Sequence, residues 1–398
     1  MSRGKISIVS DIQIGSVGKG SWVAYMANQC DMAVRTGAIQ AGHTIYFNDT
    51  KYAMQSMPCT WINPNCELIV GANGMIRQDI FEREFEWISR ALGDPTGRIT
   101  IDYAAGIMSH EHADKEKARL LSSTIGSTCE GVGEATADKV RRILPIARDT
   151  DWCKPFLGDT VTKITDAAKS GKHIVLEGTQ GIALSLSTAR RPDGNPFYPN
   201  CTSRECTPAS LMADCGLQPG INKFADVEVI GMMRTYPIRI AGPSGDMVGN
   251  EITWEEITRR CGSPMPIEEK TTVTKRVRRV SEIDWNWMKY ITNYVMPDKI
   301  VITFIDYINY DDHGKTSWDD LSDQSKQFIA QTEQTLGIPV IAVSTGPYNH
   351  QFVEVPYNVS TKDVDDDEYE TTVSGIIRKK KKVNPDLEPV YKSRINQY

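Results

Sequence analysis

The sequence predicts an α/β fold, with one large domain in which a mainly parallel central β-sheet is flanked by helices. Two observations lead to this prediction. Short apolar runs typical of buried strands alternate with amphipathic runs typical of helices along most of the 398 residues, and no linker-like stretch separates two cores. Because parallel strands need crossover connections, this alternation indicates a sheet with helices on both faces.

The individual elements follow from the same patterns. Five apolar runs are predicted as buried strands, at residues 6–9, 44–47, 67–71, 173–177 and 299–304. Helices are predicted at residues 80–92 and 137–147, and a further helical pattern begins near Trp22. Since open α/β sheets bind ligands beyond the carboxyl ends of their strands, we expect phosphate-binding loops directly after these runs.

The domain is predicted to span residues 1–358 and to be followed by a charged C-terminal extension at residues 359–398. Residues 361–370 are strongly acidic, and residues 378–382 are one arginine followed by four lysines. Charge runs of this kind are typical of solvated segments. A targeting or membrane role for the basic run is the alternative.

Composition excludes several functions. The net charge of −6 argues against broad nucleic-acid binding, which needs many basic groups to neutralise phosphates. No apolar run approaches the length of a membrane span and the N-terminus lacks a signal-peptide core, so we expect a cytoplasmic protein without a membrane partner, in the host cytoplasm if it is viral. Nine cysteines without C-x-x-C spacing indicate free thiols rather than a disulfide framework or a zinc site.

A glycine-rich turn follows the first predicted strand and reads Gly-Ser-Val-Gly-Lys-Gly at residues 15–20. Gly15, Gly18 and Gly20 let backbone N–H groups approach an oxyanion. The N-terminus of the following helix adds partial positive charge, and Lys19 adds a full charge. The turn therefore predicts a phosphate site, although no Ser or Thr follows Lys19 as in a Walker motif. A glycine-rich turn without a ligand is the alternative.

Further segments carry side chains suited to nucleotide chemistry. In chain order they are Gly42-His43-Thr44, Ile125-Gly126-Ser127-Thr128, Glu177-Gly178-Thr179-Gln180-Gly181, Tyr198-Pro199-Asn200-Cys201-Thr202-Ser203, the basic run at 271–279, Thr303-Phe304-Ile305-Asp306 and Ser344-Thr345-Gly346-Pro347. With the first loop, they resemble the motifs of adenylosuccinate synthetases, in the same order, over about residues 6–347. That family joins aspartate to C6 of IMP in a reaction driven by GTP. The resemblance therefore implies a carbon–nitrogen ligase with the P-loop-type α/β fold of that family.

The resemblance also implies roles for single residues. His43 matches the histidine that stabilises the transferring γ-phosphoryl group, and Gln180 matches the glutamine at the purine 6-oxygen. A protonatable imidazole suits this role, because charge spreads over the phosphoryl oxygens in the transition state. Mg²⁺ would lie at the positions of Ser16 and of the Gly42 carbonyl. The triphosphate would contact Gly15, Gly18, Lys19, Gly20, Gly42, Thr44, Asp306, Ser344, Gly346 and Pro347.

Two further ligands follow from the resemblance. The nucleoside monophosphate would contact Ser16, Gln40, Ser127, Thr128, Arg142, Gln180, Thr202 and Arg276. Aspartate would contact Thr272, Val273, Thr274, Arg276 and Arg278, where guanidinium groups form forks for carboxylates. Arg142 matches an arginine that reaches the phosphate from a second subunit, which implies a homodimer with Arg142 acting in trans. Taken alone, Arg142 would be read as an exposed helix charge and the basic run as a solvated face.

Five positions depart from the family pattern. Ser16 stands where the family has its catalytic aspartate, and Val17 where it has glutamate. Gln40 replaces an asparagine near the substrate base, and Lys275 replaces a glycine of the aspartate loop. Phe304 replaces the lysine that takes part in the recognition of guanine. The last change weakens selection for GTP and favours an ATP-type donor.

Ser16 decides the substrate prediction. A serine hydroxyl is too weak a base to remove the N1 proton of IMP, whereas a small hydroxyl leaves room for the 2-amino group of guanine. The replacement is similar to that in viral 2-aminoadenylosuccinate synthases, which act on dGMP in the bacteriophage pathway to diaminopurine-containing DNA. We therefore expect a Mg²⁺-dependent ligase that joins L-aspartate to C6 of dGMP with ATP or dATP, through a 6-phosphoryl intermediate. The alternatives are the standard reaction on IMP with GTP, and a nucleotide-binding regulator that has lost catalysis.

Overall fold

The computed structural model describes residues 2–271, 276–356, 369–371 and 377–379 of the 398. The chain divides into two units, Met1–Val355 and Pro356–Tyr398. In the second unit, β18 (Tyr369–Thr371) pairs antiparallel with β19 (Ile377–Lys379). The functional boundary between a catalytic domain at 1–358 and a charged extension stays a prediction.

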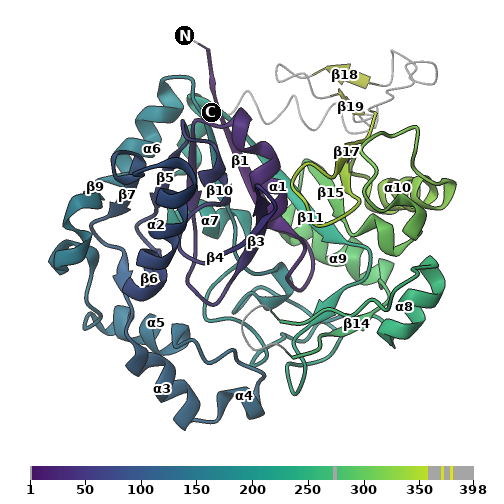
Figure 1. Ribbon diagram of the computed structural model, residues 1–398, viewed down its shortest axis with the longest axis horizontal. Coiled ribbons are helices and arrows are strands. Elements are labelled where there is room, and N and C mark those ends of the chain that lie inside the picture. Colours follow the sequence, from purple (N-terminus) through teal and green to yellow (C-terminus); the bar gives the residue numbers. More distant parts are fainter. Residues whose placement is uncertain (1, 272–275, 357–368, 372–376, 380–398) are drawn as a thin grey trace, which may run out of the picture. The chain divides into compact units, whose positions relative to one another are not determined.

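A ten-stranded sheet forms the centre of the first unit and is mainly parallel, as predicted (Figure 1). Its order is β17 (Phe352–Glu354), β16 (Val340–Ser344), β15 (Lys299–Thr303), β11 (Ala225–Arg234), β1 (Gly4–Asp11), β10 (His173–Glu177), β2 (Met32–Arg35), β5 (Glu67–Val70), β7 (Ile99–Asp102) and β9 (Leu157–Gly158). The edge strand β17 runs antiparallel to its neighbour, while the other pairs are parallel.

Helices cover both faces of this sheet, as the alternation of the sequence predicts. Those of the described residues are α1 (Lys19–Tyr25), α2 (Gln78–Leu92), α3 (His110–Ala118), α4 (Leu121–Thr124), α5 (Val132–Arg141), α6 (Thr160–Lys169), α7 (Pro208–Asp214), α8 (Trp254–Cys261), α9 (Trp285–Val295) and α10 (Asp323–Leu336). In β1, Ile8 packs in one core with α6 and α7, and Val9 packs in another with α1 and α2. This period of two is the ordinary geometry of a strand.

Most predicted elements are confirmed, and two differ. The run at 44–47 is a strand, β3 (His43–Phe47), but it pairs with β4 (Thr50–Met54) in a hairpin outside the large sheet. The helix predicted at 137–147 is wrong in position, because α5 ends before Arg142, which adopts a left-handed φ of 66°. Pro145 explains the early end, since the residue before a proline disfavours helical geometry.

The strand order places the ends of distant segments next to each other. The segments after β1, β10 and β2 lie side by side at the carboxyl edge, and those after β15 and β16 follow on the other side of β11. Smaller sheets lie beyond this edge, with β12 (Ile238–Arg239), β13 (Glu251–Ile252) and β14 (Arg279–Ser281) in one and β6 (Met75–Ile76) with β8 (Gly106–Ile107) in another. Figure 1 shows α3, α4 and α5 grouped together at the lower left. In the described part of the chain, no helix has both the length and the apolar character for crossing a bilayer.

Candidate active site

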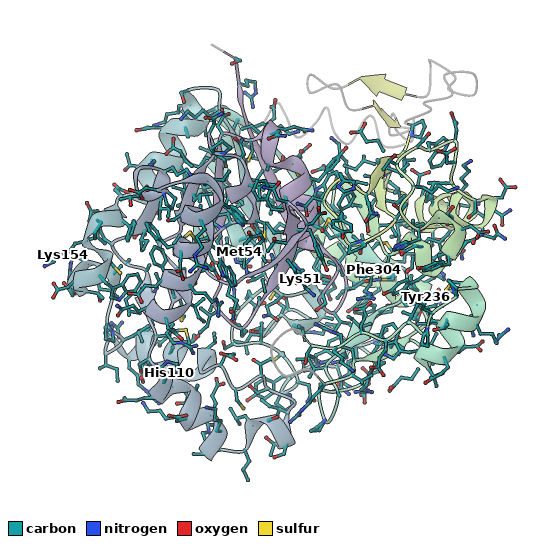
Figure 2. All side chains as sticks on the ribbon, viewed as in Figure 1. Lys51, Met54, His110, Lys154, Tyr236 and Phe304 are labelled. Atoms are coloured by element: carbon teal, nitrogen blue, oxygen red, sulfur yellow. The ribbon has the colours of Figure 1, made fainter. Side chains whose placement is uncertain are left out.

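A cavity of about 820 Å³ lies at the carboxyl edge of the central sheet. Figure 2 labels two of its lining residues, Lys51 on β4 and Phe304 after β15, near the middle of the view. The structure brings together in this lining most of the predicted site residues: Gly15, Ser16, Gly18, Lys19, Gly20, Gln40, Gly42, His43, Thr44, Ser127, Thr128, Gln180, Thr202, Arg278, Ser344, Gly346 and Pro347.

Three predicted residues lie elsewhere. Asp306 is buried outside the lining, Arg142 is exposed at the end of α5, and Arg276 lines a separate smaller pocket with Lys117 and Ser122. Nη1 of Arg276 donates to Oγ of Ser122 over 3.4 Å. Thr272, Val273 and Thr274 lie outside the described residues. Of the residues predicted to bind aspartate, Arg278 is therefore the one that the described residues place in the main cavity.

The first loop turns tightly before α1. Ser16 has a φ of 55° and Gly18 a φ of 73°, both in the left-handed region. A Cβ atom at Gly20 would lie 2.7 Å from Cβ of His43, so only glycine lets the start of α1 approach β3 this closely. The glycines thus bring the loop against the predicted phosphoryl-stabilising histidine, as well as exposing backbone N–H groups.

Lys19 is buried and connects two segments of the cavity. Its Nζ lies 3.1 Å from Oδ2 of Asp11 and donates to the carbonyl oxygen of Gln180 over 2.7 Å. Burial raises the pKa of Asp11 despite the neighbouring ammonium group. An ammonium group at the end of β1 is thereby positioned between the phosphate loop and the predicted glutamine at the purine.

His43 belongs to a buried network with Arg35 and Glu177. Oε1 of Glu177 lies 2.5 Å from Nδ1 of His43 and accepts from Nη1 of Arg35 over 2.5 Å, while Oε2 accepts from the backbone N–H of Cys59 over 2.7 Å. Burial, assisted by Arg35, lowers the pKa of His43 to about 4. Burial opposes ionisation of Glu177, but Arg35 and His43 outweigh it and hold its pKa at about 2. The network fixes the imidazole through Nδ1 and leaves Nε2 for a ligand.

The substituted position, Ser16, contacts two arginines. Its Oγ accepts from Nη1 of Arg278 over 2.7 Å, and its carbonyl oxygen accepts from Nη1 of Arg234 over 3.2 Å. Arg234 is fully buried, forms an ion pair with Glu269 and lies 4.1 Å from the ring centre of Phe304. Positive charge therefore surrounds the position at which the family pattern has a carboxylate.

Asp306 has a partner of its own in this structure. Its Oδ2 lies 2.8 Å from Nδ1 of His313, and burial raises the pKa of Asp306. The same hydrogen bond raises the pKa of His313. The other carboxylate oxygen of Asp306, Oδ1, is buried without a hydrogen-bond partner among the described residues. Phe304, in contrast, is in the lining itself.

Four residues of this site were not assigned a role from the sequence. Asp11, Arg35, Arg234 and Glu269 all contact predicted site residues, directly or through one partner. Arg35 is the one charged residue of β2, and Arg234 ends β11 after an uncharged run at residues 229–233. A charged residue at the carboxyl end of an apolar run in a parallel sheet was the hint that could have identified these two.

The cavity can bind two phosphorylated ligands through a glycine-rich loop, a buried lysine, a fixed imidazole and clustered arginines. Fold and site thus define a nucleotide-binding α/β enzyme that handles phosphoryl groups. The sequence model of the adenylosuccinate synthetase family matches residues 8–150 and 146–313.

Two curated relatives are similar to this chain over most of its length. The adenylosuccinate synthetase of Methanococcus aeolicus is 31% identical over 354 residues, which are 88% of this chain and 99% of the relative. That of Thermococcus onnurineus is 32% identical over 345 residues, which are 85% of this chain and 95% of the relative. The chain therefore belongs to the adenylosuccinate synthetase family of carbon–nitrogen ligases.

Two solved structures share the fold. The fully ligated adenylosuccinate synthetase of Plasmodium falciparum superposes with a TM-score of 0.75 at 18% identity, over 89% of this chain and all of the other. Succinoaminodeoxyadenylate synthetase (PurZ) of cyanophage S-2L, bound to dGMP and dATP, superposes with a TM-score of 0.70 at 24% identity, over 89% of this chain and 96% of the other. At these identities the likeness establishes the architecture.

Proposed function

We propose that this ligase joins L-aspartate to C6 of dGMP with ATP or dATP, and releases ADP or dADP and phosphate. The observation that carries the proposal is Ser16 at the head of the cavity, in place of a carboxylate. Its Oγ accepts from Arg278, so its own proton is directed elsewhere and one lone pair stays available. A hydroxyl in this state is suited to accept from the 2-amino group of guanine. The solved PurZ structure, which is bound to dGMP and dATP, supports the same reading.

The donor side supports an adenine nucleotide. Phe304 lines the cavity where the family motif has a lysine, and its ring is covered by the Arg234 guanidinium at 4.1 Å. Asp306 is hydrogen-bonded to His313, so its Oδ2 is already engaged. An aromatic ring without a lysine favours stacking over the hydrogen-bond recognition that guanine needs.

The proposed chemistry has two steps. The 6-oxygen of dGMP attacks the γ-phosphorus, N1 releases its proton to solvent because no residue is assigned as its base, and the bond to the β–γ bridging oxygen breaks with release of the nucleoside diphosphate. The amino group of aspartate then attacks C6 and the C6–O6 bond breaks, so phosphate leaves. Lys19 and the loop amides hold the phosphates, His43 Nε2 faces the transferring group, and Gln180 donates its amide to the 6-oxygen without adding charge.

Mg²⁺ fits this site through neutral oxygens. The proposed protein ligand is the carbonyl of Gly42, and phosphate oxygens and water would complete the octahedral shell, where the ion would neutralise charge on the phosphates. Ser16, the other ligand that the resemblance implies, accepts from Arg278 and offers its remaining lone pair to the guanine amino group, so it is not proposed as a ligand as well. His43, Cys59 and Glu177 also lie close enough together to hold an ion. This second set is a poor Mg²⁺ site, because it offers nitrogen and sulfur and because Arg35 is bound to the same carboxylate.

A specific observation also favours the standard reaction on IMP with GTP. The curated relatives described above are adenylosuccinate synthetases at 31% and 32% identity, whereas PurZ is 24% identical. Sequence identity is an average over the whole chain, however, whereas substrate choice depends on the few residues that contact the purine base. The two functions are therefore best separated by a direct assay.

A homodimer is part of the proposal. Arg142 lies at the exposed end of α5 and outside the cavity of its own chain. Two apolar neighbours, Val140 and Ile143, are 71% and 65% exposed, and Leu120 is 64% exposed. Exposed apolar side chains beside an arginine are typical of an interface. A two-fold axis here would exchange Arg142 between both sites.

The test is phosphate release by the purified full chain with Mg²⁺ and aspartate, crossing IMP, GMP and dGMP with ATP, dATP and GTP. We expect turnover with dGMP and an adenine triphosphate. Release with IMP and none with dGMP would overturn the proposal, and binding of dGMP without turnover under any combination would indicate a regulator. Ser16→Asp should abolish dGMP turnover selectively. Ser21→Asp, which adds the same charge to another serine of the lining, should lower turnover of all nucleotides alike.

A further inference from the structure

Arg239, at the end of β12, has no role in the site described so far. Its side chain is 4% exposed, and the residue lines the main cavity together with Thr202. Nη2 donates to the carbonyl oxygen of Asn200 over 2.7 Å, and Nη1 donates to that of Asp246 over 3.2 Å. Nε is buried without a partner among the described residues. A buried guanidinium thus contacts neutral oxygens at the edge of the cavity.

The charge of Arg239 is poorly compensated. Two neighbouring arginines have carboxylate partners, since Arg191 pairs with Asp246 over 2.7 Å and Arg279 pairs with Glu251. Within the described ranges, no ion pair of Arg239 itself is found. Burial, with Arg279 nearby, lowers the pKa of Arg239 to about 10. A buried cation in this state is stabilised by an anion that enters the cavity.

Asn200 connects Arg239 to the predicted phosphate loop. Its Nδ2 donates to the carbonyl oxygens of Ile125 over 3.3 Å and of Pro243 over 2.8 Å. The loop packs tightly against the same turn, because a Cβ atom at Gly126 would lie 2.6 Å from Cα of Ser244. Three segments far apart in the sequence, at 125–128, 198–203 and 242–246, therefore meet around this asparagine and the guanidinium.

We propose that Arg239 is a positioning residue for the 5′-phosphate of the bound nucleoside monophosphate. It holds the Asn200 carbonyl, which keeps Thr202 opposite Ser127 and Thr128, and it adds behind these hydroxyls a positive charge that has no ion pair among the described residues. The inference rests on the proposed nucleotide site but not on which purine fills it, because dGMP and IMP carry the same phosphate.

The experiment measures how much the phosphate contributes to binding. Calorimetry or competition gives the dissociation constants of dGMP and deoxyguanosine, of IMP and inosine, and of ATP, for the full chain. In Arg239→Met we expect the ratio of nucleoside to nucleotide dissociation constants to fall about tenfold for whichever purine binds, the size of one charge interaction at a partly buried site. Binding of ATP should change less than twofold. Arg239→Lys, which keeps the charge, should recover most of the ratio.

Arg191→Met is the matched control, because Arg191 and Arg239 both lie over the ring of Phe197 and contact Asp246, but Arg191 is outside the cavity lining. Its ratio should match that of the wild type. Asn200→Ala tests the connection with the Arg239 charge intact, and should lower the ratio as well. If Arg239→Met does not fold, Asn200→Ala decides, with folding checked by thermal unfolding. An unchanged ratio in Asn200→Ala and in any folded Arg239→Met, or an equal loss in Arg191→Met, would overturn the inference, while dGMP failing as a substrate would leave it standing through IMP.

Discussion

Oε1 of Glu177 lies 2.5 Å from Nδ1 of His43, although the two residues are 134 positions apart in the chain. The carboxylate also accepts from Arg35 and from the backbone N–H of Cys59, so it is held in place from three sides. The imidazole is oriented by this carboxylate, and burial together with the guanidinium beside it disfavours a positive charge on the ring. His43 is therefore neutral at neutral pH before an anionic ligand arrives.

This network predicts a pH dependence of stability. The pKa of His43 is about 4 in the folded chain against an ordinary 6.5, so the unfolded chain binds more protons between these values. His43 therefore contributes about 3 kcal/mol to the free energy of unfolding above pH 6.5. This contribution is lost as the pH falls toward 4. Glu177, whose pKa is about 2 in the folded chain, adds a further loss of unfolding free energy as the pH falls below 4.5.

Urea unfolding of wild type and His43→Asn at pH 7.5 and pH 5 tests this. The wild type should lose more unfolding free energy on acidification than the variant. His173, whose pKa burial also lowers, is present in both proteins, so the difference between them isolates His43. Equal losses in the two proteins would contradict the assignment.

A second prediction concerns Lys19 and Asp11. Lys19→Met removes a charge from the phosphates and should lower turnover by orders of magnitude. It also leaves the buried Asp11 without its partner, so the free energy of unfolding should fall by about 3 kcal/mol. The double variant Asp11→Asn/Lys19→Met should recover most of the stability and none of the activity. Near-normal turnover in Lys19→Met would refute the phosphate loop, and a double variant as unstable as Lys19→Met would refute the pairing.

The third prediction concerns aspartate. Arg276→Leu tests whether Arg276, which lies in the small pocket outside the main cavity, takes part in aspartate binding as the resemblance implies. The loss of one charge-assisted fork is worth about 1.5–3 kcal/mol, so the KM for aspartate should rise about tenfold to a hundredfold while that for the triphosphate stays nearly constant. Lys117→Leu is the control, since Lys117 lines the same small pocket and pairs with Asp114. Both KM values should stay within about twofold there. A parallel rise of both in Arg276→Leu would point to a structural role instead.

The fourth prediction concerns assembly. Arg142→Leu should be inactive, whereas Arg141→Leu, which removes the neighbouring exposed charge, should keep its activity. Mixing Arg142→Leu with Lys19→Ala in equal amounts should restore activity, because a heterodimer contains one site with both residues intact. Random exchange makes about a quarter of all sites intact. Failure of this rescue after subunit exchange has been demonstrated, or a monomer by light scattering at assay concentration, would count against the dimer.

Local patterns were sufficient for much of the fold. The run at 173–177 coincides with β10, and the run at 80–92 lies within α2, because apolar periodicity and length are properties of a segment by itself. The same pattern does not say which strand pairs with which. The run at 44–47 is apolar enough for the central sheet, yet it pairs with β4, since the short turn at residues 48–49 closes a hairpin first.

The sequence by itself determined the chemistry available to the site, namely a glycine-rich phosphate loop, an imidazole, a glutamine and clustered arginines, and a serine where the family has a carboxylate. The tertiary structure alone decided how these groups are partnered. Lys19 meets both Asp11 and the Gln180 carbonyl because β1 and β10 are adjacent, and Glu177 meets Arg35 because β10 also pairs with β2. These contacts join segments up to 161 positions apart, and strand order, which no local pattern encodes, is what brings them together.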